Sequence, residues 1–241
     1  MTFFRLEAGG APVRRLDLFV YAGEGTRPLL AHWRTDSFRD TVSLKTPVGG
    51  NILIAVANSP HNFNLGALSR YDAMERLSYG FADDDPAFPV LGGSVPAPHD
   101  SGTVRLNPLL CRIVLASVAN TMDGYELLED PRVRLRDIPD AAEVLREKDF
   151  RPGTFIDCGP WTALPCDVGY FPQEPGTVLW CYPIDLPENL LGTPRPFLEF
   201  ECRIRGESCS FEVPLPALPR GCTKTVELTI DGPGSYDCRI R

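Results

Sequence analysis

Proline and glycine are spread along the whole chain, and their density most limits the folds open to it. The 241 residues include 24 prolines and 21 glycines, together close to a fifth of the chain. Proline cannot continue a helix or donate to a sheet ladder, and glycine weakens both elements. Such frequent interruption suits short strands joined by turns and leaves little room for long helices. The chain is therefore predicted to be all-β, with a few short helical turns.

A strand that is apolar on both faces indicates where the chain divides. Residues 109–118 are hydrophobic at nearly every position, broken by Arg112, as in a strand covered on both sides. Pro108 ends the preceding run because it lacks the amide hydrogen that a ladder needs. A chain of this length is sufficient for two ordinary domains. We therefore expect an N-terminal β-sandwich over residues 1–107 and a C-terminal β-sandwich over residues 108–241.

Alternation of apolar and polar residues predicts the strands of the first domain. They are expected at residues 1–6, 15–21, 29–34, 41–45, 51–58, 90–94 and 103–107. Between residues 65 and 77 the apolar period lengthens to three or four, which predicts one or two short helical turns. A turn is expected at residues 47–50, where proline and glycine cluster.

The second domain shows the same alternation over longer strands. They are expected at residues 109–118, 132–136, 177–182, 197–205, 210–213 and 224–230. Asp140 and Glu143 have the spacing of a capping box, which predicts a helical turn at residues 141–146. Residues 152–175 are predicted to be rich in loops.

The hairpin near residue 206 has two registers that the sequence leaves open. With Arg205-Gly206 as its loop, Cys202 lies opposite Cys209. With a loop one residue later, Cys202 lies opposite Phe211 instead. The register therefore decides whether a disulfide across this hairpin is geometrically possible.

All eight cysteines lie at or after residue 111, and no CxxC pair occurs among them. The three histidines lie in the cysteine-free half, which argues against zinc. An even count in one domain permits disulfides in an oxidising compartment, whereas the alternative is that several are small buried hydrophobes. The candidates for disulfide formation are Cys202, Cys209, Cys158 and Cys166.

The net charge of −8 lies almost entirely in the second half of the chain. Residues 1–107 carry −1 and residues 108–241 carry −7. An acidic domain without a basic stripe argues against nucleic acid as a partner. The acidic run at residues 83–85 is interpreted as a solvated loop, with a calcium site as the alternative.

No apolar run reaches the 18 residues of a membrane helix, and no signal peptide opens the sequence. Either the protein is cytosolic or the sequence begins after an export signal. No nucleophile elbow, phosphate loop or metal motif is present either. We therefore expect no catalytic residue and no cofactor.

Two sets of residues could form a functional site, one of them polar and the other aromatic. His61 lies in the cluster at residues 58–64, which is interpreted as a turn that satisfies its own backbone. Trp161, Tyr170 and Trp180 could form an aromatic platform for a glycan, or could pack within the core and anchor loops.

Six short runs stand in a particular order along nearly the whole chain. They are residues 16–21 (LDLFVY), 57–58 (AN), 108–113 (PLLCRI), 127–133 (LLEDPRV), 181–183 (CYP) and 192–195 (GTPR). In this order the chain resembles the fimbrial anchor and minor-subunit proteins of Bacteroidales, the FimB type of type V pilus proteins. No single run is as specific as a metal signature, so the ordered set carries the resemblance.

The resemblance implies two tandem transthyretin-like Greek-key β-sandwiches in a non-enzymatic anchor or accessory subunit of the fimbrium. It implies export as a lipoprotein to the cell outer membrane and a role in cell adhesion. The implied partners are other pilus subunits, joined by exchange of a β-strand, and a host or bacterial surface ligand. The alternative is a surface glycan-binding adhesin module.

Two features of the N-terminal half bear on this resemblance. No cysteine occurs before Cys111, so a lipid-bearing N-terminal cysteine is expected upstream of Met1. Arg14-Arg15 could be a processing site for a trypsin-like protease, as in stalk subunits. The alternative is that these arginines are solvent-facing charges before a strand.

Overall fold

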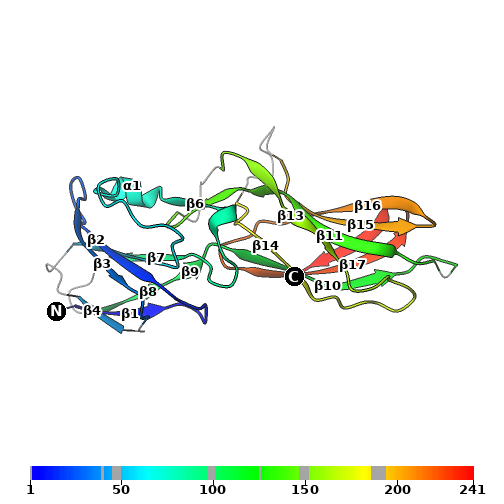
Figure 1. The fold of residues 1–241 in the computed structure, drawn as a ribbon, viewed down its shortest axis with the longest axis horizontal. Coiled ribbons are helices and arrows are strands. Elements are labelled where there is room, and N and C mark those ends of the chain that lie inside the picture. Colours follow the sequence, from blue (N-terminus) through cyan, green and yellow to red (C-terminus); the bar gives the residue numbers. More distant parts are fainter. Residues whose placement is uncertain are drawn as a thin grey trace. The chain divides into compact units, whose positions relative to one another are not determined.

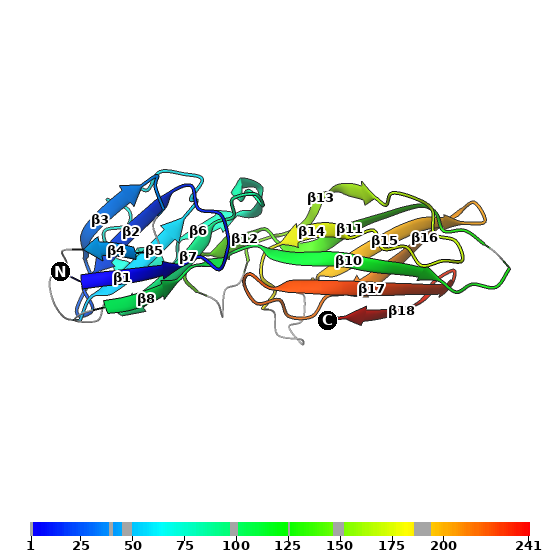
Figure 2. The same cartoon turned by 90° about the horizontal axis from the view of Figure 1, so that it is seen from below.

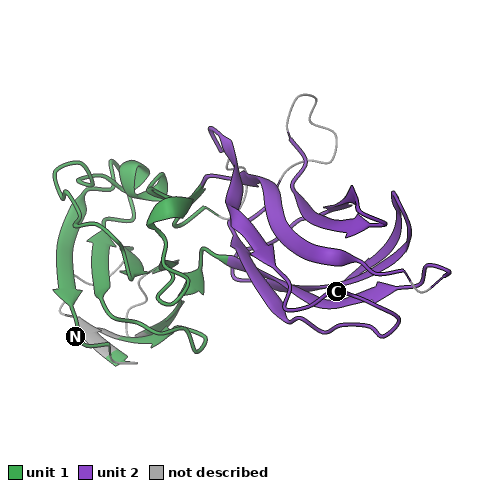
Figure 3. Ribbon diagram, turned by 45° about the vertical axis from the view of Figure 1, so that its right-hand side comes forward, with its two compact units in different colours: residues 1–110, 141–151 green, residues 111–140, 152–241 purple. Residues whose placement is uncertain are grey.

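The computed structural model describes residues 2–38, 41–44, 50–96, 101–124, 126–146, 152–185 and 194–241. The chain forms two compact units (Figure 3). Unit 1 comprises Met1–Leu110 and Ala141–Arg151, and unit 2 comprises Cys111–Asp140 and Pro152–Arg241. Residues 47–49 of the turn expected at residues 47–50 lie outside the described residues, as does the start of the run at residues 192–195.

Unit 1 is a sandwich of a five-stranded and a three-stranded sheet (Figures 1 and 2). The larger sheet has the order β3 (Leu29–Thr35), β2 (Leu16–Tyr21), β5 (Ile52–Ala57), β7 (Leu91–Pro96) and β9 (Asn107–Pro108). The smaller sheet has the order β4 (Thr41–Leu44), β1 (Thr2–Glu7) and β8 (Ser101–Arg105). The strands predicted for this half are confirmed to within a few residues, except that the run at residues 103–107 is divided between β8 and β9 in different sheets.

Strand β2 is buried on both faces, since each face is covered by a different part of unit 1. Leu16, Leu18 and Val20 belong to the core cluster that also contains side chains of the smaller sheet. On the other face, the Tyr21 hydroxyl donates to the Leu68 carbonyl at 2.8 Å, and helix α1 (Tyr71–Glu75) covers the ring. With the 3-10 turn η1 (Phe81–Asp83), α1 confirms the expectation of short helical turns.

The helical turn predicted at residues 141–146 is wrong. Ala141–Glu143 form strand β12, which pairs antiparallel with β6 (Ser78–Gly80) within unit 1. The Val144 amide extends this ladder by donating to the Leu77 carbonyl at 2.8 Å. The Glu143 carboxylate binds Arg146. The cap is a weak local preference, whereas the ladder satisfies several backbone groups and buries Ala142.

Unit 2 is a sandwich of two four-stranded sheets (Figure 2). One sheet has the order β14 (Thr177–Cys181), β10 (Cys111–Asn120), β17 (Thr223–Gly232) and β18 (Ser235–Ile240). The other has the order β13 (Phe155–Ala163), β11 (Glu129–Pro139), β15 (Phe197–Ile204) and β16 (Glu207–Pro214). The prediction of an all-β sandwich fold is confirmed.

Two strands of unit 2 were not among those predicted from the sequence. β13 occupies part of the stretch expected to be loop-rich, and its pairing with β11 contains two register shifts. β18 follows a tight turn at Gly234, whose φ of 79° favours glycine. In each case glycine and proline signals conceal a strand that its sheet neighbour stabilises.

Candidate functional site

The N-terminal strand β1 lies in the middle of the smaller sheet of unit 1. It pairs antiparallel with β4 on one side and parallel with β8 on the other. The Phe4 and Leu6 side chains are 1% and 2% exposed and belong to the core cluster. β1 therefore fills a slot between two strands and closes the core beneath it.

The loop after β1 carries the two arginines that could be cleaved. The Arg15 guanidinium donates to the carbonyl oxygens of Ser59 and His61, the latter at 2.8 Å. The Arg14 guanidinium stacks on the Phe88 ring at 3.0 Å from its centroid. Both side chains thus have structural partners, which favours the interpretation that they anchor the chain ahead of β2.

The polar cluster around His61 supports backbone structure. Asn58 has a φ of 57°, and its side-chain amide donates to the Pro12 and Pro89 carbonyls at 2.8 and 2.9 Å. The Ser59 hydroxyl donates to the His61 carbonyl at 2.8 Å and accepts from the Tyr79 hydroxyl at 2.6 Å. The Ser59 bond satisfies the turn's own backbone, as predicted, whereas the Asn58 side chain holds two other segments of unit 1.

A buried carboxylate that sequence reasoning missed lies beside this turn. Asp17 is fully buried on β2. Its Oδ1 lies 2.8 Å from His32 Nε2 and 2.9 Å from Arg34 Nε, while Oδ2 lies 3.6 Å from Arg15 Nε. The sequence did contain a signal for this cluster. It places an aspartate within an apolar strand, and basic residues occur on the strand that follows. The cluster ties β2 to β3, because a buried charge needs such partners.

The acidic run at residues 83–85 also has structural contacts. Asp84 is buried and accepts from the Val90 amide at 2.8 Å, and Asp85 accepts from the Ala87 amide at 2.9 Å. Asp83 and Asp85 are exposed, as in the solvated loop that was expected, whereas the buried Asp84 fixes the turn. Within the described ranges, no group of three or more His, Cys, Asp or Glu side chains is arranged to hold a metal ion.

Strand β18 lies at the edge of its sheet, at the end of the order β14–β10–β17–β18. Its side chains alternate, with Tyr236, Cys238 and Ile240 half-buried and the residues between them exposed. The Tyr236 ring packs edge-on against Phe211 at 6.0 Å. An edge strand with one apolar face can add to another sheet through its backbone.

The disulfide candidates have different environments, and all eight cysteines are free thiols in this structure. The β15–β16 hairpin has Arg205-Gly206 as its loop, so Cys202 lies directly opposite Cys209. Cys158 is buried on β13, whereas Cys166 is exposed and contacts Gln173 Oε1 at 3.3 Å. Burial raises the pKa of the Cys202 and Cys158 thiols to about 12. Disulfide formation by these residues stays a prediction.

The three aromatic residues of the glycan hypothesis belong to different elements. Trp161 lies on β13, half-buried beneath the guanidinium groups of Arg132 and Arg134 at 4.7 and 4.2 Å. Trp180 is half-buried on β14 in the other sheet. Tyr170, in a loop, is 77% exposed. The structure thus leaves Tyr170 as the accessible ring of the three.

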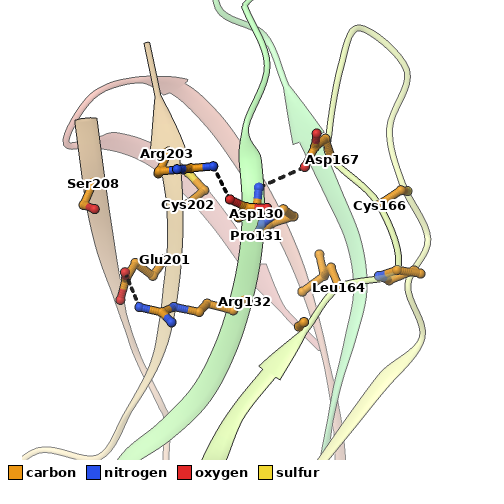
Figure 4. Close-up of a pocket in the computed structure, with 12 residues that line it drawn as sticks. Asp130, Pro131, Arg132, Leu164, Cys166, Asp167, Glu201, Cys202, Arg203 and Ser208 are labelled. Atoms are coloured by element: carbon orange, nitrogen blue, oxygen red, sulfur yellow. Dashed lines mark hydrogen bonds and ion pairs between the residues drawn. The ribbon is translucent and has the colours of Figure 1, made fainter. Parts of the chain in front are cut away.

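A pocket of about 570 Å³ opens between β11, β15 and the loop after β13 (Figure 4). Arg132 donates to Glu201 at 2.6 Å and Arg203 pairs with Asp130 across it. The Asp130 amide donates to Asp167 Oδ1 at 2.9 Å. The Arg132–Glu201 and Arg203–Asp130 ion pairs therefore balance charge within the pocket.

Among the described residues, no helix is long and apolar enough to cross a membrane. No protein-family model matches the sequence. No curated protein is similar to it in sequence.

Solved structures with the same fold come from Bacteroidales. A candidate cell adhesion protein from Parabacteroides distasonis aligns at a TM-score of 0.77 and 12% identity, covering 100% of this chain and 95% of that one. The fimbrilin FimA from Porphyromonas gingivalis aligns at 0.69 and 12% identity, covering 99% and 96%. The tip fimbrial protein Mfa3 from the same species aligns at 0.62 and 11% identity, covering 100% and 98%. At these identities the likeness establishes the fold, which this chain shares over its whole length.

Proposed function

We propose that this protein is a non-enzymatic anchor or accessory subunit of a type V pilus that joins neighbouring subunits by β-strand exchange. The observation that carries the proposal is the place of β1 between β4 and β8, with two side chains in the core. Withdrawal of β1 leaves a groove with two unpaired strand edges. A strand from a second subunit restores the backbone hydrogen bonds and the buried side chains.

Strand β18 has the pattern that such a groove accepts. In β1, Phe4 and Leu6 point into the core, two positions apart. In β18, Tyr236, Cys238 and Ile240 alternate with polar residues in the same way. A strand that alternates apolar and polar side chains fits a slot that is buried on one face. The donor strand is therefore β18 of a neighbouring subunit, while the sandwich of unit 1 is the acceptor.

Localisation follows from this proposal. A pilus subunit acts outside the cell, so the protein is exported and held at the outer membrane through an N-terminal lipid. The solved structures of similar fold include fimbrial and adhesion proteins, which supports a surface role in cell adhesion.

Peptide binding to a variant that begins at Leu16 tests the exchange. A labelled peptide of residues 2–7 should rebind to this variant, which shows that the groove remains open. A peptide of residues 232–241, with Cys238 replaced by serine, should compete with it. A peptide with Tyr236 and Ile240 both replaced by aspartate should not compete, because its apolar face is lost.

The outcomes separate the parts of the proposal. Rebinding of the first peptide without competition by the second would reject β18 as the donor. Binding of neither peptide, by a variant that keeps the circular dichroism of a β-protein, would reject strand exchange altogether.

One observation favours a second candidate, a glycan-binding adhesin module. Tyr170 and Phe171 are 77% and 74% exposed, with their rings edge-to-face at 5.4 Å. Exposed aromatic faces can stack on sugar rings. Binding on a glycan array that is lost when both residues are replaced by alanine would support this function, and an array without binding would reject it.

A further inference from the structure

Three cysteines of unit 2 lie side by side at one end of the β14–β10–β17 sheet. Cys111 opens β10 and lies directly opposite Cys181, the last residue of β14. Cys222 immediately precedes β17, and Arg112 pairs with Thr223 in the parallel β10–β17 ladder. The Arg112 amide donates to the Cys222 carbonyl at 2.9 Å. The register therefore places Cys222 beside Cys111 on the neighbouring strand.

The spacing of Cys111 and Cys222 suits a disulfide. Neighbouring strands lie about 4.8 Å apart, within the range of about 4.4–6.8 Å that disulfide-bonded Cα atoms span. The two thiols lie within hydrogen-bonding distance of each other. The Cys111 thiol also donates to the Pro219 carbonyl at 3.2 Å, which holds the sulfur on the side of β17.

Solvent exposure distinguishes the Cys111–Cys222 pair from the alternative pair, Cys111 and Cys181. Both Cys111 and Cys181 are fully buried, whereas Cys222 is half-buried. Burial raises the pKa of the Cys222 thiol, but its hydrogen bond with Cys111 and the charge of Lys224 act in the opposite direction. Cys222 is therefore the thiol that an external oxidant reaches first, and Cys111 is its nearest partner.

We propose that Cys111 and Cys222 form a disulfide that fastens the first strand of unit 2 to β17. The oxidant is a small-molecule or protein disulfide. The Cys222 thiolate attacks one of its sulfurs, forms a mixed disulfide and releases the first thiol. Cys111 then loses its proton, attacks the Cys222 sulfur and releases the second thiol. Two protein thiols and one external disulfide thus become one protein disulfide and two external thiols.

The bond has a consequence for strand exchange, and this consequence rests on the proposed function. With Cys222 tethered to Cys111, β17 stays in its sheet. The turn at Gly234 then marks the point beyond which the chain can detach, so β18 alone is free to leave. Oxidation would thereby limit the donor to the C-terminal strand.

Peptide mapping of the full chain tests the bond without any partner subunit. The purified protein is treated with oxidised glutathione at mildly alkaline pH, its remaining thiols are alkylated, and it is digested with trypsin without reduction. The cleavage sites predict a linked pair of peptides, residues 106–112 and 221–224, each with one cysteine. The pair should disappear on reduction.

Variants and heating provide the matched comparison. The oxidised wild type should unfold at a higher temperature than its reduced form, because the bond restricts the unfolded chain. The Cys222→Ser variant should give no linked peptides and should lose the rise in unfolding temperature that this bond causes. The Cys166→Ser variant, changed in an exposed loop, should keep the linked peptides and the rise in unfolding temperature. The proposal is overturned if Cys111 is recovered alkylated, or linked to Cys181. The peptide map and the unfolding temperature do not depend on strand exchange. A negative result in them would therefore reject the disulfide without rejecting the proposed function.

Discussion

Buried carboxylates in both units are held by basic side chains from neighbouring strands. In unit 1, Asp17 on β2 is paired with His32 and Arg34 on β3. In unit 2, Glu199 on β15 accepts from Arg134 at 2.8 Å and Arg136 at 3.3 Å on β11. Such pairs specify which strands are neighbours, because removal of one partner leaves a buried charge without compensation.

Glu199 should make stability depend on acid pH. Burial by itself raises the pKa of this carboxyl, but hydrogen bonds from Arg134 and Ser210 and the nearby positive charges outweigh burial and lower it. Its contribution is therefore present above the unfolded-state pKa, about 4.5, and is lost as pH falls through the lower folded-state value. Glu199→Gln should be less stable than the wild type at pH 7, and the difference should shrink below pH about 4.5.

Urea unfolding at a series of pH values measures this difference. Glu174→Gln, at an exposed carboxylate in the loop between β13 and β14, is the matched control and should behave as the wild type. A constant gap between wild type and Glu199→Gln from pH 7 to pH 3 would contradict the role given to this carboxylate.

At the scale of elements, the turns decide the register of the strands. In the β15–β16 hairpin, Arg205 and Gly206 have φ values of 54° and 79°, as in a type I′ turn that matches the twist of the strands. This turn selects one of the two registers that the sequence left open. It places Cys202 opposite Cys209 and Phe200 opposite Phe211.

Gly206→Ala should destabilise unit 2 by about 1 kcal/mol, because a Cβ at this φ is strained although the space around it is open. Gly153→Ala is the matched control. Gly153 is exposed, has open space around it and lacks a positive φ, so its replacement should be neutral or slightly stabilising. Thermal unfolding of both variants checks the prediction, and equal shifts would refute it.

Element type was predictable where one face of a strand is buried, as in β11 and β17, because the period of the side chains survives in the sequence. Strand β12 was not predictable, since its ladder with β6 joins residues about sixty positions apart. β13 carries register shifts, which weaken its alternation. β18 keeps its alternation, but it is short and follows a turn rich in glycine.

At the scale of the whole molecule, unit 1 is discontinuous in sequence. Residues 141–143 add strand β12 to it after the chain has already built β10 and β11 of unit 2. The first passage from unit 1 to unit 2 lies between Leu110 and Cys111, after β9 has paired with β7. The chain returns to unit 1 before unit 2 is complete, so the two units are linked by more than one passage.

A fragment of residues 1–110 should therefore fold with an exposed edge at β6. Its Tyr79 amide should exchange with deuterium faster than in the full chain, because Tyr79 lies opposite Ala142 in a ladder that is missing from the fragment. The amides of β5, which lies between β2 and β7, should keep their protection. Equal protection of β6 in the fragment and in the full chain would show that β12 does not stabilise this part of unit 1.

The sequence by itself determined the all-β class, the short strands and most of their faces. These follow from proline and glycine density and from side-chain period, which are local properties. The tertiary structure decided that β1 fills a central slot, that β12 returns to unit 1, and that Cys111, Cys181 and Cys222 meet at one end of the β14–β10–β17 sheet. Each of these depends on pairing between residues far apart in the chain, and no local pattern specifies which distant strand will satisfy a given backbone edge.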